Sequence, residues 1–439
     1  MFFGERGEKA IEILHSCGYE AYFVGGCVRD ALMGLTANDV DITTSALPIQ
    51  TIKAFEGYRV IATGIKHGTV TVLIDGEPIE ITTYRCDGEY LDHRHPESAS
   101  FTSDISEDLC RRDFTVNAMA YSPKRGFVDL FGGREDLEAG VIRAVGDPEK
   151  RFDEDALRIA RAVRFASQKD FVIEERTAQA IRKQLPLLAH VSAERCFVEL
   201  RKLIIGRGAE RVMTEFPEVI SALVPPLKPC IGFEQHNPHH IYDVYRHTAR
   251  AVGAAPFDED VRLAALLHDV GKPSTFSIKD GVGHFYGHSE ASVELARQTL
   301  EALKCDNARM QRVLTLIKYH DPVIAPEKTR VKRLLGKIGQ ELFYKLLDLK
   351  SADNLAQAPM CAERLKEYDE LRRIAREITE ASECFSLKSL DINGDDLIAL
   401  GVPRGKDIGR ILSTLLNAVM DGEIENNKSA LIDKVNKIR

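Results

Sequence analysis

The chain has 439 residues, of which 44% are hydrophobic and 29% charged, so it has the composition of a soluble globular protein but too many residues for one core. Its formal net charge of −8 excludes a generic polyanion-binding protein, so any nucleic-acid substrate must be held by local basic surface. No run of about eighteen apolar residues occurs and the N-terminus carries charges of both signs, which predicts a cytoplasmic protein without a membrane span.

Residues 1–145 mix helical and strand patterns. Apolar residues at helical spacing predict a helix over 5–17. The stretches EAYFVGG, NDVDITT, RVIATG, GTVTVLI and PIEITTY predict strands, most of them through their β-branched residues. The polar stretch 87–104, DGEYLDHRHPESASFTSD, has no periodicity and predicts a long mobile loop of the kind that is usually functional or disordered.

From about residue 146 onward the strand patterns nearly vanish. EDALRIARAVRFASQ, AERCFVELRKLI and RLAALLHDV have the amphipathic pattern of helices, as does most of the remaining chain. Proline and glycine cluster at 222–238, which predicts a boundary between an N-terminal catalytic unit and a central histidine-rich one. These patterns together predict an α+β protein.

The stretch FVGGCVRDALMGLTANDVDITT combines features of a phosphate site and a metal site. Gly25 and Gly26 stand between a predicted strand and a predicted helix, where glycines let the backbone turn tightly and aim N–H groups at phosphate; Arg29 follows one turn later. Asp39 and Asp41 are two apart in a predicted strand, so both carboxylates leave the same face. Such a pair could hold two divalent ions about 3.5–4 Å apart, as in enzymes that displace pyrophosphate. No P-loop or Rossmann motif occurs in this segment.

These motifs carry a family resemblance. GG-x-VRD followed by D-x-D resembles the polymerase β-type nucleotidyltransferase superfamily, in its bacterial class II branch of tRNA nucleotidyltransferases and poly(A) polymerases. RRDFTVNAMAY (111–121) is similar to that branch's ribose-reading motif, which implies Arg112, Asp113 and Asn117 near the sugar. EDALRIARAVRF resembles its base-reading helix and AERCFVELRKLI the neck motif behind it, so that the match covers roughly residues 20–205.

Asp155 and Arg158 are three apart in the predicted base-reading helix, so we expect them side by side on one face. A carboxylate beside a guanidinium suits the amino group and ring-nitrogen acceptor that cytosine and adenine share, and it disfavours guanine and uracil. The resemblance assigns the same base-reading role to this pair; an ordinary surface ion pair is the alternative. Arg161 and Arg164 continue along nearly the same side and are expected to line the path of nucleotide or RNA.

A second set of metal-ligand residues lies between 236 and 355. The series H…HD…H…H…D resembles HD-domain phosphohydrolases, which implies one metal on four residues and a second metal completed by two more histidines. The first set is His247, His268, Asp269 and Asp353, and the second is His288 and His320. Imidazole and carboxylate together favour a transition metal such as Mn, Fe, Ni or Zn over Ca. We expect His236, His239 and His240 to be surface or capping residues.

The C-terminal segment resembles that of HD-bearing members of the same branch. In LGVPRGKDIGRIL, Gly401 and Gly405 frame a predicted turn between helices, beside Arg404 and Lys406. A helix N-terminus with basic neighbours suits a phosphate, so the turn is expected to contact the tRNA backbone, unless it is only a solvated hairpin.

The resemblance therefore implies an α+β chain of four parts. These are a polymerase β-like nucleotidyltransferase head of mixed sheet and helices (1–145), an all-α base-reading neck (146–230), an HD metal-binding domain (231–360) and a helical tRNA-binding tail (361–439). The implied reaction adds C, C and A to the tRNA 3′ end from CTP and ATP, with Mg²⁺ on Asp39 and Asp41. Glu80, in the predicted strand PIEITTY, is a candidate for a third carboxylate.

Three alternatives stay open at this point. A poly(A) polymerase shares the head motifs, and a CC-only or A-only enzyme shares still more of the chain, although the full-length loop at 87–104 favours complete CCA addition over CC-only addition. The third alternative is a metal phosphohydrolase whose nucleotidyltransferase half only binds RNA, against which the intact Asp39 and Asp41 count.

Overall fold

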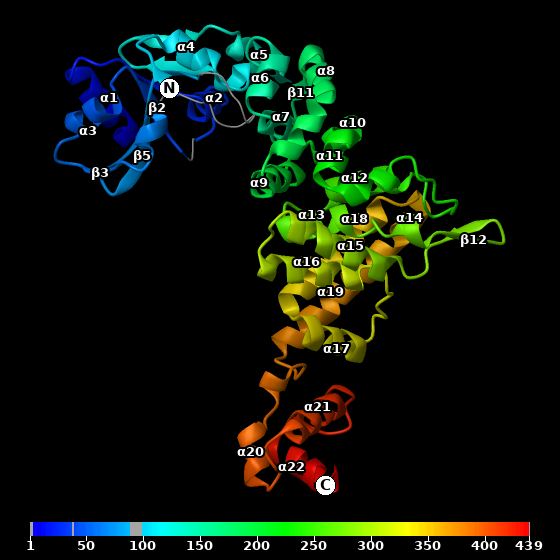
Figure 1. Ribbon diagram of the computed structural model, residues 1–439. Coiled ribbons are helices and arrows are strands. Elements are labelled where there is room, and N and C mark those ends of the chain that lie inside the picture. Colours follow the sequence, from blue (N-terminus) through cyan, green and yellow to red (C-terminus); the bar gives the residue numbers. More distant parts are fainter. Residues whose placement is uncertain (1–2, 37–38, 88–98, 439) are drawn as a thin grey trace. The chain divides into compact units, whose positions relative to one another are not determined.

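The computed structural model of the chain describes residues 3–36, 39–87 and 99–438. Most of the predicted loop at 87–104 therefore lies outside the described residues, so its predicted mobility stays a prediction. The chain divides into two compact units, Met1–Leu223 and Val224–Arg439, and the division falls within the proline- and glycine-rich stretch 222–238 (Figure 1).

A mixed sheet organises the first part of the first unit. Among the described residues it has seven strands in the order β3-β4-β5-β2-β1-β8-β9. The strands are β1 (Ala21–Val24), β2 (Asp41–Thr44), β3 (Arg59–Ile61), β4 (Thr69–Ile74), β5 (Glu77–Thr83), β8 (Met119–Ser122) and β9 (Gly126–Asp129). The pairing of β2 with β5 is parallel, and the other neighbours in the sheet run antiparallel. The strands predicted from the β-branched stretches are confirmed.

The sheet is stabilised by burial on the face that the sequence pattern selects. In β4 the alternating side chains Val70, Val72 and Ile74 are buried, as the period of two in a strand requires. The helices α1 (Glu5–Ser16) and α3 (Pro48–Ala54) pack against the strands, and α2 (Gly26–Leu32) follows β1 directly (Figure 1). The helix predicted over 5–17 is thus confirmed.

Helices dominate the rest of the first unit. They are α4 (Ile105–Cys110), α5 (Gly133–Ala139), α6 (Pro148–Glu154), α7 (Leu157–Lys169), α8 (Glu175–Gln184), α9 (Ala193–Ile204), α10 (Ala209–Glu215) and α11 (Pro217–Leu223). Short two-stranded sheets accompany these helices. Strand β6 (Arg85–Asp87) pairs with β7 (Ala99–Phe101), and β10 (Val141–Ile142) pairs with β11 (Val172–Ile173). Helices α7 and α9 pack closely together.

The expectation of one helix through EDALRIARAVRF is wrong at its start. Helix α6 ends at Glu154 and α7 begins at Leu157, while Asp155 has extended backbone angles (φ −140°, ψ 102°). The Asp155 carboxylate accepts a hydrogen bond from the Leu157 backbone N–H at 3.1 Å. Aspartate side chains compete in this way with helical carbonyl groups for nearby backbone N–H groups, so the helix is interrupted at Asp155.

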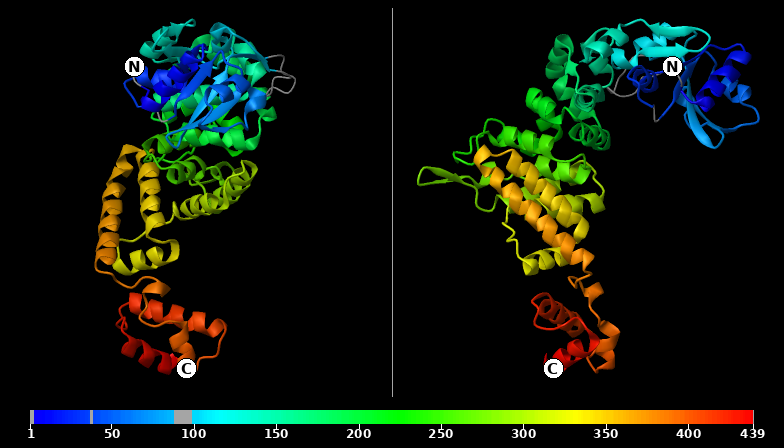
Figure 2. Two further views of the ribbon diagram at one scale, coloured as in Figure 1. Left: turned by 90° about the vertical axis from the view of Figure 1, so that its left-hand side faces the viewer. Right: turned by 180° about the vertical axis from the view of Figure 1, so that it is seen from behind.

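The second unit is almost entirely helical. Its helices are α12 (Val244–Ala254), α13 (Glu259–Leu267), α14 (Lys272–Thr275), α15 (His288–Ala302), α16 (Asn307–Tyr319), α17 (Lys328–Ile338), α18 (Gln340–Leu355), α19 (Arg364–Glu380), α20 (Gly394–Ala399), α21 (Lys406–Met420) and α22 (Lys428–Ile438). The two long helices α18 and α19 lie side by side in the left-hand view of Figure 2. A short hairpin, β12 (Ser277–Lys279) with β13 (Val282–His284), interrupts the helices and was not predicted.

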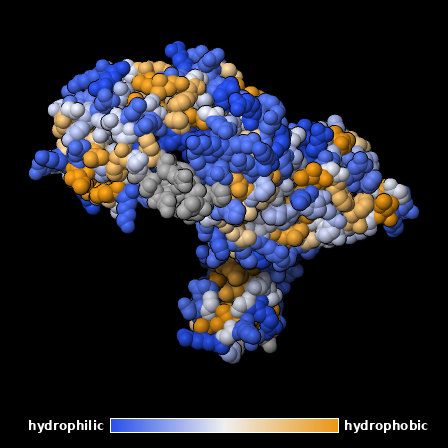
Figure 3. All heavy atoms as spheres, turned by 45° about the horizontal axis from the view of Figure 1, so that its top comes forward, coloured by the Kyte–Doolittle hydropathy of each residue, from blue (hydrophilic) through white to orange (hydrophobic). Residues whose placement is uncertain are grey.

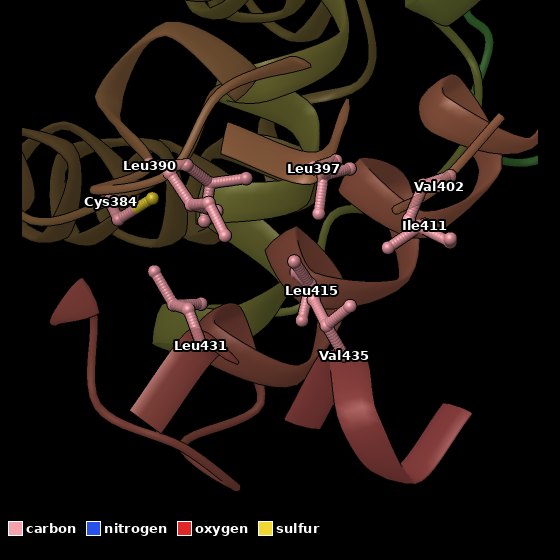
Figure 4. Close-up of a cluster of buried hydrophobic side chains, with 9 residues drawn as sticks. Cys384, Leu390, Leu397, Val402, Ile411, Leu415, Leu431 and Val435 are labelled. Atoms are coloured by element: carbon pink, nitrogen blue, oxygen red, sulfur yellow. The ribbon is translucent and has the colours of Figure 1, made fainter. Parts of the chain in front are cut away.

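The last three helices enclose a small hydrophobic core of their own. Figure 4 shows Leu397, Ile411, Leu415, Leu431 and Val435 pointing toward one another. All five are at most 4% exposed. The predicted turn framed by two glycines does lie between helices, here α20 and α21.

Hydrophilic residues cover most of the face that Figure 3 shows, and the hydrophobic ones there form separate small groups. Among the described residues, no helix combines the length and the apolar character that crossing a bilayer requires.

Candidate active site and metal centre

The glycine turn after β1 has the conformation that the sequence predicts. Gly25 has φ 75° and ψ −129°, in the region that favours glycine, and its N–H donates to the Met119 carbonyl at 3.2 Å. A Cβ at Gly25 would lie only 3.1 Å from Nη1 of Arg112. The turn therefore lies against an arginine of the predicted ribose-reading motif, and a larger residue would push that arginine away.

Asp39, Asp41 and Glu80 are among the six carboxylate residues that line one open cavity of about 850 Å³. Asp41 is the first residue of β2 and pairs in register with Glu80 of the parallel strand β5. Asp39 lies in a bend before β2, so the expectation that both aspartates belong to the strand is wrong, because the ladder with β5 begins only at Asp41. Both aspartates and Glu80 nevertheless line the same cavity.

The electrostatics of this cluster fit a divalent cation. Partial exclusion of water raises the pKa of Asp41, the nearby charges of Glu80 and Asp39 raise it further, and Arg112 opposes them. Carboxylate oxygens whose negative charges repel one another are relieved by a bound cation, and they are the ligands that Mg²⁺ prefers. The donor set present therefore fits Mg²⁺.

A second, smaller pocket of about 250 Å³ in the first unit is strongly basic. Five arginines and two aspartates line it together with Leu157; these are Arg111, Arg112, Arg158, Arg161, Arg195, Asp113 and Asp155. Such a concentration of guanidinium groups is the local basic surface that a chain of net charge −8 needs for binding a polyanion.

Arg29 is buried and held in place by its neighbours. Its Nη1 donates to Asn117 Oδ1 at 2.5 Å and its Nε to Asp30 Oδ1 at 2.9 Å. Its guanidinium also lies over the Phe165 ring, 5.4 Å from the centroid. Arg29 is not among the residues lining either the 850 Å³ cavity or the basic pocket. The structure thus brings Arg29 and Asn117 together, behind the glycine turn.

Asp113 is held as a charged carboxylate inside the basic pocket. Arg161 donates to Asp113 Oδ2 through Nε at 2.8 Å and Nη2 at 2.6 Å, and Asn117 Nδ2 donates to Oδ1 at 3.1 Å. Burial alone would raise the pKa of Asp113, but Arg161 and these hydrogen bonds lower it to about 2. Asp113 thus ties the predicted ribose-reading motif to α7.

The predicted base-reading pair meets at the pocket but does not form an ion pair. Asp155 accepts from Arg195 Nη2 at 2.9 Å, whereas Arg158 pairs with Glu154 at 2.8 Å. Arg158 Nη1 also donates to the Arg151 carbonyl and its Nη2 to the Arg111 carbonyl. The break after Glu154 causes this arrangement, because it takes Asp155 out of the helical face on which Arg158 lies.

In the second unit, four of the six predicted HD residues converge from different elements. His247 of α12 lies 3.3 Å from His268, measured between the two Nε2 atoms, and 3.0 Å from Asp353 Oδ1 of α18. His268 follows the last residue of α13, and its Nε2 lies 3.1 Å from Asp269 Oδ2. Burial would lower the pKa of His268, but the two carboxylates raise it to about 10. The two carboxylates beside these imidazoles supply the negative charge that suits a bound cation.

The other two histidines complete the cluster. His288 begins α15 and His320 follows α16, and their Nε2 atoms are 3.3 Å apart. Each lies within 4 Å of Asp269 Oδ1, at 3.6 and 3.8 Å. Two overlapping triads have donor atoms close enough to share one ion, His247–His268–Asp353 and His268–Asp269–His320. The structure thus brings all six predicted residues together.

The four histidines share one orientation. Each ring places Nδ1 near a backbone carbonyl, at 3.2 Å for His247, 2.8 Å for His268, 2.8 Å for His288 and 2.6 Å for His320. If Nδ1 carries the proton, Nε2 is left with a free lone pair directed at the cluster. This is the arrangement of metal-ligating histidines, whose second nitrogen donates to a carbonyl or carboxylate.

Comparison with known proteins decides the family. Residues 21–143 match the Poly A polymerase head domain, residues 170–218 the RNA and SrmB-binding site of polymerase A, and residues 286–435 tRNA nucleotidyltransferase domain 2. The chain is 35% identical to the CCA-adding enzyme of Ligilactobacillus salivarius, covering 98% of this chain and 96% of that one. It is 36% identical to the CCA-adding enzyme of Geobacillus stearothermophilus, covering 96% and 94%. The chain belongs to the CCA-adding enzyme family.

Solved structures agree with this assignment. The CCA-adding enzyme of Bacillus stearothermophilus, crystallised in complex with CTP, is similar with a TM-score of 0.75 and 31% identity, covering 99% of this chain and 98% of that one. The CCA-adding enzyme of Thermotoga maritima, complexed with tRNA, shares the fold with a TM-score of 0.57 at 21% identity. As a member of this family, the chain is a nucleotidyltransferase with a polymerase-type head, as the sequence predicted.

Several residues of the first unit escaped the sequence prediction or lie elsewhere than expected. Arg164 does not line the basic pocket; it is buried and donates to Glu199 of α9 at 2.7 Å. Arg195 was not predicted, yet it holds Asp155, and its Nη1 is buried without a hydrogen-bond partner among the described residues. The sequence feature that could have pointed to a role for Arg195 was its position in the predicted neck motif AERCFVELRKLI.

The metal cluster also has neighbours that sequence reasoning missed. His240 was expected to be a surface or capping residue, but its ring contacts that of His247 and it lines the cavity beside the cluster. Lys272 is buried with Nζ 2.7 Å from Asp269 Oδ2, and Gln357 Nε2 donates to Asp353 at 3.3 Å. The sequence pattern H-D-x-x-K could have predicted this contact of Lys272, because residues three apart in a helical turn lie side by side, here Lys272 and Asp269.

Proposed function

We propose that this nucleotidyltransferase completes tRNA by adding C, C and A to its 3′ end, using CTP and ATP. The observation that carries the proposal is that Asp39, Asp41 and Glu80 line one cavity, while Arg112, which lies against the Gly25 turn, is close enough for its charge to act on Asp41. An acidic metal site next to a phosphate-binding turn is what nucleotidyl transfer requires. The names of the relatives support tRNA as the acceptor.

In the proposed reaction, the oxygen of the terminal ribose hydroxyl bonds to the α-phosphorus of the nucleotide and its proton passes to water. The bond from the α-phosphorus to the α,β-bridging oxygen breaks, and pyrophosphate leaves with that oxygen. Asp39 and Asp41 would hold Mg²⁺, with Glu80 beside them, and the bound ions would supply activation of the hydroxyl and charge neutralisation of the leaving group. Gly25 and Gly26 let the backbone approach the triphosphate, with Arg29 behind the turn. Arg112, Asp113 and Asn117 are proposed to contact the sugar, as the resemblance implies.

The basic pocket is proposed to read the base. Asp155 is a fixed acceptor there, because Arg195 and the Leu157 N–H hold its carboxylate. Arg158 uses three of the five N–H groups of a guanidinium in bonds to Arg151, Glu154 and Arg111, which leaves two for a base. An acceptor beside spare donors matches the amino group and ring nitrogen common to cytosine and adenine. Arg161 and Arg164 serve this pocket by fixing α7, through Asp113 and Glu199.

Asp155→Asn should raise the use of UTP and GTP relative to CTP and ATP. Asparagine offers an N–H donor to the carbonyl that uracil and guanine present, and it removes part of the mismatch cost. That cost is about 1–3 kcal/mol. We therefore expect the ratio of kcat/KM for CTP and ATP to kcat/KM for UTP and GTP to fall by roughly ten- to a hundredfold. The measurement is kcat/KM for all four triphosphates.

Asp170→Asn is the matched control for this experiment. It makes the same chemical change at the other end of α7, where the backbone has φ 55°, a conformation that asparagine tolerates. Unchanged selectivity is expected there. If Asp155→Asn lowered all four kcat/KM values equally, the residue would be structural and the base-reading proposal would be wrong.

We also propose a metal-dependent phosphohydrolase activity for the second unit, in which His247, His268, Asp269 and Asp353 hold one ion and His288 and His320 contribute to a second. Six ligand side chains from five helices or helix ends, four of them oriented through Nδ1, favour this second function. Mixed imidazole and carboxylate donors suit Mn, Fe, Ni or Zn. The bound ions would activate water and hold a phosphate oxygen.

The turn between α20 and α21 is proposed to contact the tRNA backbone. Arg404 and Lys406 are exposed there, on either side of Gly405. Their positive charge at the start of a fifteen-residue helix suits a phosphate.

A further inference from the structure

The ring of Phe165 lies where three guanidinium groups of the first unit meet. Phe165 belongs to α7 and is 6% exposed. The guanidinium carbon of Arg164 is 3.6 Å from the ring centroid, and that of Arg161 is 5.3 Å from it. The guanidinium carbon of Arg29, from helix α2, is 5.4 Å from the same centroid. Cation–π attraction acts within about 6 Å, so all three arginines are in range.

Three like charges around one ring repel one another, and their surroundings offset this repulsion. Each arginine pairs with a carboxylate of its own: Arg29 with Asp30, Arg161 with Asp113, and Arg164 with Glu199. Some repulsion remains, because burial lowers the pKa of Arg164, Glu199 opposes this, and the charge of Arg161 lowers that pKa further. The negative face of an aromatic ring attracts cations, whereas an aliphatic side chain of similar size does not.

A chain of hydrogen bonds joins Arg29 to Arg161 beside this ring. Arg29 Nη1 donates to Asn117 Oδ1 at 2.5 Å, and Asn117 Nδ2 donates to Asp113 Oδ1 at 3.1 Å. Arg161 closes the chain by donating to Asp113 Oδ2 through Nε at 2.8 Å and Nη2 at 2.6 Å. Both ends of the chain therefore contact Phe165, so one ring supports the arginine behind the glycine turn and the arginine that holds Asp113.

The same face of α7 holds α2 at a second point. Lys169 Nζ donates to Asp30 Oδ1 at 2.9 Å. Arg161, Phe165 and Lys169 follow one another at intervals of four residues, so they form one stripe along α7. Helix α2 directly follows the glycine turn, and its contacts with this stripe therefore also fix the turn.

We propose that Phe165 is a positioning residue of nucleotidyl transfer, whose ring holds the guanidinium groups of Arg29 and Arg161. Through these two groups the ring keeps the glycine turn and Asp113 in place for the incoming nucleotide. This inference rests on the nucleotide-binding roles proposed above for that turn and for Asp113. Phe165 lines neither the 850 Å³ cavity nor the basic pocket, so its effect on the reaction passes through the two arginines.

The test weakens the π face of Phe165 without removing the ring. In the full-length protein, Phe165 is replaced by phenylalanine that carries one, two or three ring fluorine atoms, which withdraw electron density from the face and change the volume little. KM for CTP and for ATP should rise with each added fluorine, by about three- to thirtyfold in the trifluoro variant, with kcat nearly unchanged.

The same series at Phe152 is the matched control. Phe152 is a fully buried residue of α6, and among the described residues no arginine or lysine lies over its ring. Fluorination there changes a buried ring in the same unit without weakening a cation–π contact. KM for both nucleotides should therefore stay at the wild-type value.

Calorimetric titration with CTP and Mg²⁺, in the absence of tRNA, measures nucleotide binding independently of turnover. The Kd for CTP should rise along the fluorine series at Phe165 and stay constant along the series at Phe152. If the wild type adds nucleotides to tRNA but KM and Kd are constant at Phe165, or change equally at both positions, the positioning role is overturned and the proposed function stands. If the fluorine dependence of Kd appears but the wild type adds no nucleotide, the proposed function fails and the ring's role in nucleotide binding stands.

Discussion

Asp41→Ala is expected to abolish nucleotide addition, lowering turnover by about a thousandfold or more. The change removes an oxygen ligand of the proposed Mg²⁺ site, which should cost several kcal/mol of transition-state stabilisation. The fold should survive, because Asp41 stands at the exposed end of β2 and its carboxylate is repelled by Glu80. The measurement is single-turnover addition to tRNA, together with the melting temperature and tRNA affinity of the variant.

Glu77→Ala is the matched control, since Glu77 lines the same cavity and stands on the strand that carries Glu80. It should keep nearly full turnover, because the resemblance gives it no ligand role. Asp39→Ala should behave like Asp41→Ala, although Asp39 lies before the strand. Turnover of even a tenth of wild type in either aspartate variant would contradict the two-metal assignment.

The double change His268→Ala, Asp269→Ala is expected to remove bound transition metal from the second unit and to eliminate its phosphohydrolase activity. Most of the short distances between ligand atoms in the cluster involve His268 or Asp269, and the double change removes both side chains. CCA addition should be retained, because the nucleotidyl-transfer residues belong to the other compact unit. Metal analysis of purified protein and nucleotide addition are measured on the same preparations.

His239→Ala serves as the control, because His239 is an exposed histidine of the same unit and belongs to neither triad. It should bind as much transition metal as wild type. Equal metal content in wild type and in the double variant would show that the six residues do not form a metal site.

Local sequence patterns were sufficient for the parts of the fold that depend on near neighbours. The strands of the head follow from β-branched residues at a period of two, and the glycine turn follows from the φ 75° that Gly25 adopts. The H-D dipeptide at the end of α13 was equally readable, because an apolar helix stops directly before it. The resemblance added the order in which these pieces meet.

Pairings between distant residues were not readable in the same way. Arg195 reaches Asp155 across 40 positions, and the pairing depends on how α9 packs against α7. The break after Glu154 also escaped prediction, because no proline or glycine marks it and only the side chain of Asp155, just before the apolar pattern of ALRIARAVRF, ends the preceding helix. The hairpin of β12 and β13 is too short for its strand pattern to stand out from its helical surroundings.

The most direct test of the proposed function is to incubate the protein with tRNA that lacks its CCA end and with each triphosphate singly and in combination, and then to sequence the products. We expect two cytidines with CTP alone, and C, C and A with CTP and ATP together, with extension ending after the third nucleotide. A long run of adenosines would identify a poly(A) polymerase, and an arrest after CC or addition only to tRNA ending in CC would identify a partial enzyme. Any of these results would contradict complete CCA addition.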